Sequence, residues 1–324
     1  MPSRVLERVV YPYLGRRPDV LLHAHLGEDC AAVEFGEWVA VLTTDPVTGA
    51  AAHLGRYAVH VSCNDLATSG AEPVALLLTL LLRDGTTEEE LEQIMREAGE
   101  VARSLGVEIV GGHTEVTPGI DRTIAVVTAL GRARRGRVLS AAGARPGDTV
   151  LLTKSAGVEG TAILALDLAD RLRGRVEEEV LVRARGFLEK ISVVAEGLAA
   201  AGNGAAAMHD VTEGGVLGGA WELAEAAGAG IEIHADAVPV APETAAICAA
   251  LGVDPLRLIG SGAMLIATSS PERTAAAVRQ AGVPVAEIGV VTAQERVVVR
   301  SGRRMPLAAP EADELWRVLA EVRR

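Results

Sequence analysis

Apolar positions recur along this chain with two different periods, which predict two kinds of element. Between Thr86 and Gly106, apolar residues recur every three or four positions, the spacing of one face of an α-helix. Thr87 and Glu90 have the spacing of a capping box, and Gly106 follows the last apolar position. The pattern therefore predicts a helix that begins after Thr87 and ends before Gly106, with one face buried.

Strand-length apolar runs alternate with helix-length segments in both halves of the chain. We expect strands at residues 37–45, 73–82, 107–116, 123–131, 148–153, 231–236 and 263–268. We expect helices at residues 56–71, 86–106, 158–172, 176–202, 214–228 and 311–324. This alternation predicts sheets layered with helices, an α+β fold. An arginine-rich segment followed by the sequence ARPGD marks a boundary, so we divide the chain into domains 1–140 and 141–324.

The expected helix at residues 56–71 carries a carboxylate on its apolar side. His53, Tyr57, Val61 and Asp65 lie four positions apart, so they share one helical face. Because an unpaired charge on an inward face is costly, Asp65 requires a partner. That partner is an arginine, a set of backbone donors or a cation.

Three further carboxylates stand at the ends of expected elements, and with Asp65 they predict a metal site. Asp29 lies in the segment GEDCAAV, Asp45 ends the strand at 37–45, and Asp210 lies in the segment HDVTEGG. Mg²⁺ prefers carboxylate oxygens, usually one or two per ion together with substrate phosphates. The alternative for each aspartate is an ordinary cap or turn residue.

A Gly-Gly pair follows the apolar run at 107–110. We expect Gly111 and Gly112 to form a turn, at which the backbone can approach a ligand closely. His113 comes next and is a candidate for positioning phosphate or substrate. The alternatives are a plain tight turn and a histidine that only forms local hydrogen bonds.

Two positions in the second half are candidates for anion binding. Gly214 and Gly215 open an amphipathic helix, whose free N-terminal amides favour an anion. Lys154 follows an expected strand and is a candidate phosphate contact. The alternatives are close helix packing through glycine and a solvated lysine. There is no Walker A segment and no GxGxxG after a first strand, so the usual nucleotide-binding folds are disfavoured.

Composition narrows the class of partner. The 324 residues are 49% hydrophobic, which is enough for two domains with their own cores. The net charge of −12 argues against nucleic acid and anionic membranes as partners. With only Trp 3, Tyr 3 and Phe 2, base stacking is a poor basis for recognition.

Three features favour a cytoplasmic protein. Cys30, Cys63 and Cys248 are scattered without a CxxC motif, so we expect them to be reduced and buried. The first ten residues lack the apolar core of a signal peptide. The apolar run at 74–82 is too short to span a bilayer and predicts a buried strand instead.

Seven short motifs occur in one order over nearly the whole chain. They are GEDCAAV, TTDPVTG, CNDLATSGAEP, GGHTE, GARPGDTVLLT, HDVTEGG and SGAMLIAT. In this order they resemble the superfamily of aminoimidazole ribonucleotide (AIR) synthetase. That superfamily includes the hydrogenase-maturation dehydratase, thiamine-monophosphate kinase and selenophosphate synthetase.

The resemblance implies an architecture and a ligand. It implies an N-terminal α/β domain, a C-terminal α+β domain, a homodimer built mainly by the N-terminal sheets, and ATP bound through Mg²⁺. By position, the metal and nucleotide carboxylates correspond to Asp29, Asp45, Asp65 and Asp210, and the nucleotide-site positions to Asn64, Gly111 and Gly112. The partner of Asp65 is then metal and triphosphate.

The members of the superfamily differ in a few distinguishing residues, and this chain can be compared with each member at those positions. The Gly-Thr-Lys segment of AIR synthetase is absent from DPVTGAAAH, and the catalytic Cys or Sec and Lys of selenophosphate synthetase are absent from the first 17 residues. Thiamine-monophosphate kinase usually has Asp where His113 stands. The chain is most similar to the hydrogenase-maturation dehydratase, although it ends LWRVLAEVRR without that enzyme's terminal cysteine, so we expect a tail-less relative.

The resemblance implies an ATP- and Mg²⁺-dependent enzyme that activates an oxygen of a small, unidentified acceptor by phosphoryl transfer. Its catalysis would be mainly positioning and charge neutralisation. The candidate catalytic residues are Asp210, His113 and Lys154, and Gly214–Gly215 is expected to face the acceptor or the transferred phosphate. The alternative is a non-catalytic nucleotide-binding protein with an assembly or regulatory role, since fold alone does not decide activity.

Overall fold

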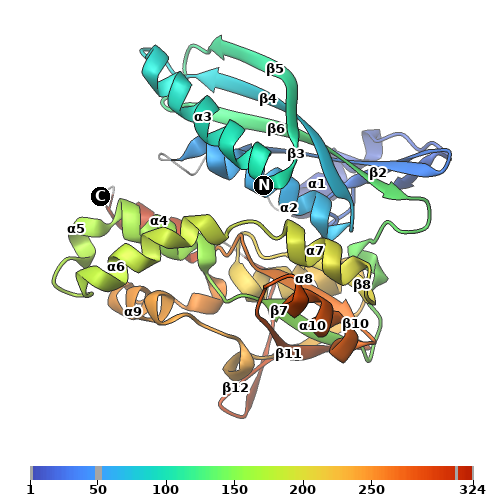
Figure 1. Cartoon of the computed structure of the whole chain (residues 1–324). Helices are drawn as coiled ribbons and strands as arrows, with labels where there is room; N and C mark the ends of the chain where they lie inside the picture. The colour runs from blue at the N-terminus through green and yellow to red at the C-terminus, as the bar shows by residue number, and fades with distance from the viewer. Residues whose placement is uncertain (1–2, 48–52, 311–312, 323–324) are drawn as a thin grey trace.

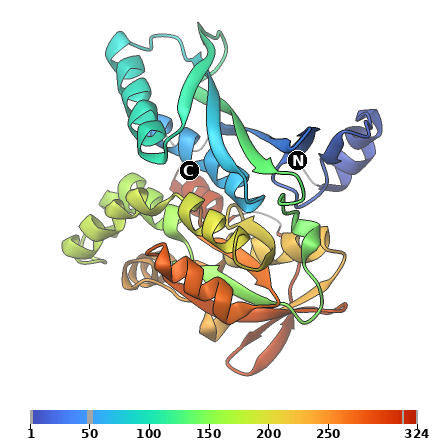
Figure 2. The ribbon, with the colours of Figure 1, turned by 45° about the vertical axis from the view of Figure 1, so that its right-hand side comes forward.

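The chain folds into two layered halves, each built on one β-sheet (Figure 1). The computed structural model describes residues 3–47, 53–310 and 313–322. Figure 2 shows the N-terminal half stacked on the C-terminal half. Both sheets carry helices, which confirms the predicted α+β fold, and the connection between the sheets runs from residue 135 to 148, around the expected boundary at 140.

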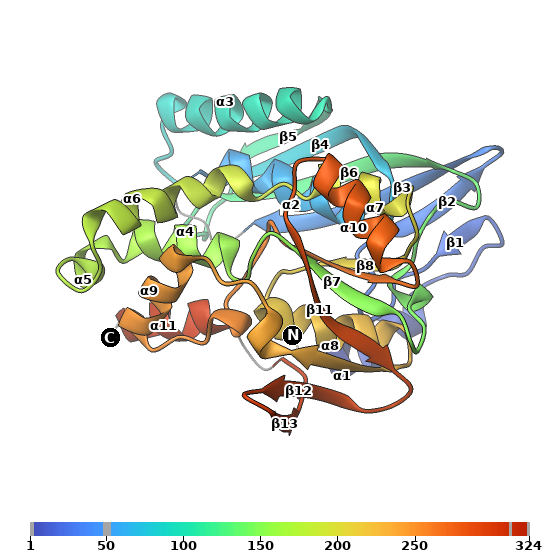
Figure 3. The ribbon, with the colours of Figure 1, turned by 60° about the horizontal axis from the view of Figure 1, so that its bottom comes forward.

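The N-terminal sheet has the strand order β1-β2-β3-β6-β4-β5. Its strands are β1 (Val20–Leu22), β2 (Ala31–Phe35), β3 (Trp38–Val47), β4 (Glu72–Leu82), β5 (Glu108–Val116) and β6 (Ile124–Arg134). The helices of this half are α1 (Ser3–Val9), α2 (Leu54–Thr68) and α3 (Glu88–Leu105), with the 3₁₀ helix η1 (Tyr11–Tyr13). Only β4 and β5 pair in parallel; the other neighbours are antiparallel. Helices α2 and α3 lie over one face of this sheet (Figure 3).

Two N-terminal elements follow directly from their sequences. The predicted capping box is present at α3, since the Thr87 side chain accepts from the Glu90 amide and the Glu90 carboxylate accepts from the Thr87 amide. The run predicted as a buried strand is only half buried: Leu76 and Leu78 lie in the core, whereas Leu77 is 48% exposed. The prediction was wrong for that face because alternate side chains of a strand point to opposite sides, and only one side of this sheet is covered by helices.

The C-terminal sheet has the strand order β13-β12-β9-β11-β7-β10-β8. Its strands are β7 (Thr149–Thr153), β8 (Ala205–Asp210), β9 (Gly230–His234), β10 (Met264–Thr268), β11 (Val285–Thr292), β12 (Arg296–Arg300) and β13 (Arg303–Pro306). The helices are α4 (Val158–Asp167), α5 (Ala169–Leu172), α6 (Glu178–Arg185), α7 (Val194–Ala201), α8 (Gly215–Ala226), α9 (Pro242–Leu251), α10 (Pro271–Gln280) and α11 (Glu314–Val322). Four short 3₁₀ helices complete this half: η2 (Ala141–Gly143), η3 (Gly186–Lys190), η4 (Ala235–Ala237) and η5 (Pro255–Arg257).

Strand β7 has buried apolar side chains on both faces of the second sheet. Val150 and Leu152 belong to the core that packs against α8, whereas Leu151 belongs to the core on the side of α7 and α10. Both faces are therefore covered, and the consecutive apolar residues at the centre of TVLLT, Val150 to Leu152, are what a strand with two buried faces requires. The core on the side of α7 and α10 continues into the core under the N-terminal sheet, because α2 packs against both β3 and α7.

Asn64 on α2 joins the two halves. Its side-chain Nδ2 donates to the Ile191 carbonyl at 2.9 Å, and its Oδ1 accepts from the Val193 amide at 2.8 Å. The segment 176–202, predicted as one helix, is therefore broken into α6, η3 and α7. Backbone groups at the break bond to Asn64 instead of to the next helical turn, a tertiary competition that the local pattern does not contain.

Gly111 and Gly112 do not form the predicted turn. They lie inside β5, which continues through His113 to Val116. A Cβ on Gly112 would collide with the Leu78 carbonyl of β4, so the glycine permits close approach of two strands rather than a reversal of the chain.

Two other expectations concern the ends of the chain and its cysteines. The helix predicted at 311–324 is present as α11, and residues 311, 312, 323 and 324 lie outside the described part. Cys30, Cys63 and Cys248 are free and buried, as predicted.

Among the described residues, no helix has the length and apolar character needed to cross a bilayer.

Candidate functional site

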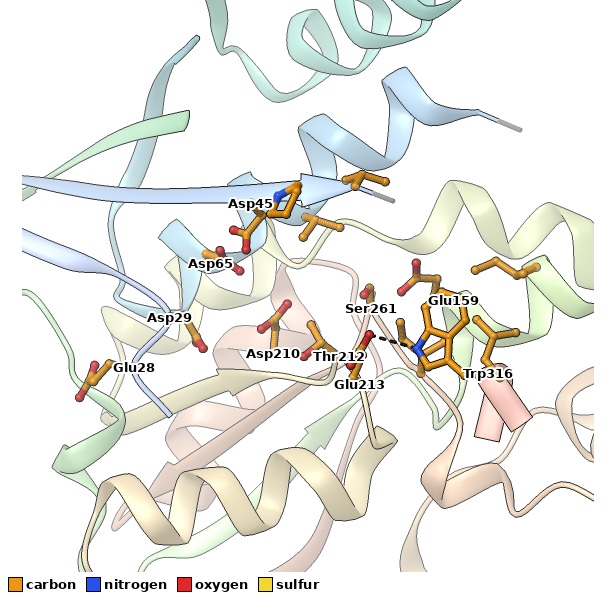
Figure 4. A pocket seen from close by; sticks show the side chains of 16 residues that line it. Glu28, Asp29, Asp45, Asp65, Glu159, Asp210, Thr212, Glu213, Ser261 and Trp316 are labelled. Carbon is orange, nitrogen blue, oxygen red and sulfur yellow. Dashed lines mark hydrogen bonds between the residues drawn. The ribbon is translucent and has the colours of Figure 1, made fainter. Parts of the chain in front are cut away.

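A pocket of about 390 Å³ opens between the two halves of the molecule (Figure 4). Its lining residues are Glu28, Asp29, Asp45, Pro46, Val47, Val61, Asp65, Glu159, Ile163, Asp210, Thr212, Glu213, Ile259, Ser261, Leu315 and Trp316. Seven of these side chains are acidic, and none of the described lining residues is a lysine, arginine or histidine. An anionic ligand can therefore bind here only if a cation accompanies it or the acidic groups take up protons.

The structure brings together the four predicted metal carboxylates. Asp45 lies on β3, Asp65 on α2, Asp29 in the loop before β2, and Asp210 at the end of β8, and all four line the pocket. Asp45 and Asp65 converge on the Thr43 hydroxyl, whose Oγ1 lies 3.1 Å from Asp45 Oδ2 and 2.7 Å from Asp65 Oδ2. These elements come from both halves, so the site depends on their packing.

His209 lies among the carboxylates and was missed at the level of sequence. Its Nδ1 lies 2.7 Å from the Asp210 carbonyl oxygen, which leaves Nε2 to face Asp29 at 3.8 Å and Glu222 of α8 at 3.4 Å. Asp29, His209 and Asp210 form the one group of three ligand-type side chains found within 4.8 Å of one another among the described residues. The signal was present, because His209 immediately precedes Asp210 in the motif HDVTEGG.

Burial and mutual repulsion disfavour ionisation of these carboxyls in the metal-free protein. Burial raises the pKa of Asp65, and the neighbouring Asp210 and Asp45 raise it further. Burial and the charge of Asp29 raise the pKa of Asp210 to about 8. The pKa of His209 is raised to about 9, because the surrounding carboxylates outweigh the effect of its burial. His209 is thus a cation that partly balances the cluster.

The donor set fits a magnesium ion. Asp210 is 2% exposed, and its Oδ2 has no hydrogen-bond partner among the described residues. A buried carboxylate oxygen without a partner is costly, and a hard divalent cation with oxygen ligands would satisfy it. Asp29, Asp45, Asp65 and Asp210 are the residues that would hold Mg²⁺, with His209 beside them.

Lys154, a candidate phosphate contact from the sequence, is not among the residues that line this pocket. Its ammonium donates to the Ser192 and Gly262 carbonyls, each at 2.8 Å, and pairs with the buried carboxylate of Glu196. An ammonium has three N–H donors, and all three are taken. The residue has a positive φ of 54° and links the end of β7 to the start of α7.

The predicted anion site at Gly214–Gly215 is taken by the chain itself. The Gly214 amide donates to Asp313 Oδ2 at 2.7 Å, and the other oxygen of Asp313 accepts from the Leu315 amide at 2.8 Å. The carboxylate therefore occupies the start of α8 and caps α11. An external phosphate would have to displace Asp313, which is 2% exposed.

The remaining predicted residues lie elsewhere. Asn64 is fully buried and bonded between the two halves, as described above. Gly111, Gly112 and His113 lie on the edge strand β5, where His113 Nε2 contacts Glu115 at 3.2 Å, and none of the three lines this pocket. Their nucleotide roles stay predictions.

Glu159, Glu213 and Trp316 line the opposite end of the pocket and were not singled out from the sequence (Figure 4). Glu159 lies on α4 and is 7% exposed, and burial raises its pKa to about 7. Trp316 of α11 donates its indole N–H to Glu213 Oε1 at 3.1 Å. Glu159 left a signal in the sequence, because it is the only charged residue in the apolar stretch VEGTAILA.

Comparison with known proteins places this architecture in a family. Residues 27–133 match the family model described as AIR synthase related protein, N-terminal domain, and residues 145–302 match its C-terminal counterpart. The chain is 31% identical over 287 residues to the carbamoyl dehydratase HypE of Rhizobium leguminosarum bv. viciae, covering 85% of this chain and 79% of that protein.

Solved structures agree with this match. The crystal structure of E. coli HypE, a hydrogenase maturation protein, has a TM-score of 0.75 and 27% identity over 98% of each chain. A structure of HypE in complex with ATP shares the fold at a TM-score of 0.70 and 23% identity, covering 96% of this chain and 95% of that one. The resemblance inferred from the ordered motifs and the predicted two-domain fold are thereby confirmed. The chain belongs to the AIR synthase related family.

Proposed function

We propose that the protein is an ATP- and Mg²⁺-dependent enzyme that activates an oxygen of a small acceptor by phosphoryl transfer. The observation that carries this proposal is the pocket itself. Asp29, Asp45, Asp65 and Asp210 line it together, and no described lysine or arginine lines it. A divalent metal would balance the charge of a triphosphate in such a pocket, because carboxylates and phosphates together are the usual ligands of Mg²⁺. ATP is the nucleotide in one solved structure with this fold.

The residues of the pocket have distinct tasks in this proposal. Bound Mg²⁺ would neutralise the charge on the transferred phosphoryl group. Asp45 and Asp65 hold their carboxylates at the Thr43 hydroxyl, and Asp210 presents a free oxygen from the second half. His209 keeps a positive charge beside Asp29 and Asp210, which limits their repulsion. The chain thus contributes positioning and charge balance, which is the main requirement of phosphoryl transfer.

The fate of ATP tests this proposal. With Mg²⁺ and a panel of small oxygen acceptors, we expect ADP to form faster with one acceptor class than without any acceptor. The phosphoryl group should appear on the acceptor oxygen, or as phosphate once that activated oxygen has been displaced. Phosphorus NMR or chromatography of the nucleotides separates ADP from AMP, and the same mixture with EDTA is the control. AMP with pyrophosphate would contradict transfer of the terminal phosphoryl group.

A non-catalytic nucleotide-binding role is the alternative. It keeps the four carboxylates but needs no acceptor, so it predicts metal-dependent ATP binding with no acceptor-dependent turnover. The free cysteines are all buried, which is compatible with the cytoplasmic location that we propose for either role.

We also propose that the protein is a homodimer joined through the open face of the N-terminal sheet. This face carries exposed apolar side chains on adjacent strands, including Leu77 of β4, Val110 of β5 and Leu130 of β6. Such a face in water favours association, and the family resemblance implies a second copy of the chain as the partner. Gly111, Gly112 and His113 of β5 would then lie next to the interface.

Leu77→Asp is expected to convert a dimer into a monomer, because a buried unpaired carboxylate at the interface is costly. Light scattering at micromolar concentration should give twice the chain mass for the wild-type protein and a single chain mass for the variant. Val182→Asp, at an exposed apolar residue of α6 in the other half, is the matched control and should leave the dimer intact. A wild-type monomer would contradict the proposal.

A further inference from the structure

One buried carboxyl at the pocket has no part in the carboxylate cluster. Glu159 lies in the first turn of α4, and its Oε2 is buried without a hydrogen-bond partner among the described residues. The polar groups that influence the ionisation of Glu159 are Ser261, Asp313 and Glu213. Those that influence the ionisation of Asp210 include Asp29, Asp45 and Glu222. The pocket therefore has two acidic ends with separate neighbours, as Figure 4 also shows.

The end around Glu159 is partly apolar. Trp316 and Ser261 lie beside Glu159 (Figure 4). The pocket lining also includes Ile163, one helical turn after Glu159 on α4, and Leu315, which shares an apolar cluster with Ile163. Glu213 lies between the two ends, with one carboxylate oxygen held by the Trp316 indole N–H. A ligand here would find acceptor oxygens and apolar walls, but no cationic side chain among the described residues.

This combination defines a ligand chemistry. An ionised carboxylate is an acceptor only, so the groups that complement Glu159 and Glu213 are N–H or O–H donors, and cations above all. A buried acceptor without a partner in the protein is a costly feature unless a ligand satisfies it. The metal end would take the phosphates, which leaves this end for the acceptor molecule.

We propose that Glu159, with Ser261, Glu213 and Trp316, forms the acceptor subsite, and that this subsite takes a compound with a nitrogen hydrogen-bond donor on a small apolar body. The donor is an amine, an amidine or an amide. The assignment to an acceptor rests on the proposed phosphoryl-transfer function, but the binding preference itself does not.

Three nearly isosteric probes test this preference on the full-length protein. Benzamidine carries a cationic N–H donor, benzamide a neutral one, and benzoate none. Titration calorimetry with Mg²⁺ present should show binding of benzamidine or benzamide and no binding of benzoate. Mg²⁺ is included because benzamidine bound at the metal carboxylates would be displaced by it. Binding of benzoate as tight as that of benzamidine, or no binding of any probe, would overturn the proposal.

Glu159→Gln locates the probe and separates the two donor types. Gln keeps the shape and an acceptor oxygen but not the charge, so benzamidine should bind about tenfold more weakly while benzamide binding is retained. Benzamidine binding unchanged by Glu159→Gln would overturn the assignment of Glu159. The matched control is Glu287→Gln, at an exposed position of β11, which should bind both probes like the wild type. The melting temperature of each variant checks that it is folded.

A separate titration distinguishes this inference from the proposed function. Mg²⁺ with ATP is titrated into the wild type and into Glu159→Gln, and we expect both to bind it equally. If neither binds ATP while benzamidine binding depends on Glu159, the proposed function fails and the subsite remains. If both bind ATP but no probe binds either protein, the subsite fails and the nucleotide site remains.

Discussion

Asp210→Asn is expected to raise the melting temperature of the metal-free protein and to abolish most of the further rise that Mg²⁺ with ATP gives the wild type. Asp210 is buried beside Asp29, and one of its oxygens has no partner among the described residues. Asp210 is ionised in the unfolded chain, and in the metal-free folded protein it must either take up a proton or remain charged beside Asp29, and Asn removes that cost. The same change removes an oxygen ligand that a bound cation needs.

The size of the ligand effect follows from mass action. A ligand at one hundred times its dissociation constant stabilises the folded state by about 2.7 kcal/mol, a shift that a thermal unfolding assay resolves easily. The wild type should show this shift with ATP plus Mg²⁺ and not with ATP plus EDTA. Asp210→Asn should show little shift in either mixture, although it unfolds at a higher temperature without ligand.

A matched control separates the metal site from a general charge effect. Asp84→Asn changes an exposed aspartate in the loop after β4, so it should shift with Mg²⁺ and ATP as the wild type does. An Asp210→Asn protein that kept the full metal-dependent shift would exclude Asp210 from the metal site. A wild-type shift that is identical with EDTA would reject the metal-bridged pocket altogether.

Lys154→Met is expected to lower the free energy of unfolding by about 3–5 kcal/mol, the usual cost of breaking a buried ion pair by removing one partner. The Lys154 ammonium is the cationic partner of Glu196, whose side chain is 1% exposed. Its loss would leave that carboxylate without its cation and two backbone carbonyls, of Ser192 and Gly262, without their donor. Urea denaturation followed by circular dichroism measures the change.

Two further variants assign the cause. Lys154→Met combined with Glu196→Gln removes the buried charge as well, so it should be more stable than Lys154→Met alone. Lys190→Met changes the only other lysine of the chain, which is exposed on η3, and should cost little. A Lys154→Met protein of wild-type stability that loses ATP turnover would instead favour the phosphate role predicted from the sequence.

Local sequence patterns were sufficient for features that depend on neighbours in the chain. The capping box of α3 needs only Thr87 and Glu90, which lie on the same helical turn, and it is present as predicted. Asp65 was placed on a buried helical face because the period of an α-helix is the same in every fold. The ordered motifs determined the family, and with it the four carboxylates that line the pocket.

Features that depend on distant segments were decided only by the tertiary structure. Asn64 breaks the expected long helix because it bonds backbone groups more than 120 positions away in the sequence. Lys154 and the start of α8 were predicted to meet phosphate, but Glu196 and Asp313 already occupy them. Glu159 and Trp316 share a pocket only because α11 packs on α4, where Leu315 and Ile163 belong to one apolar cluster. Spacing along a chain specifies which face of an element a residue occupies, whereas packing of the elements decides what that face meets.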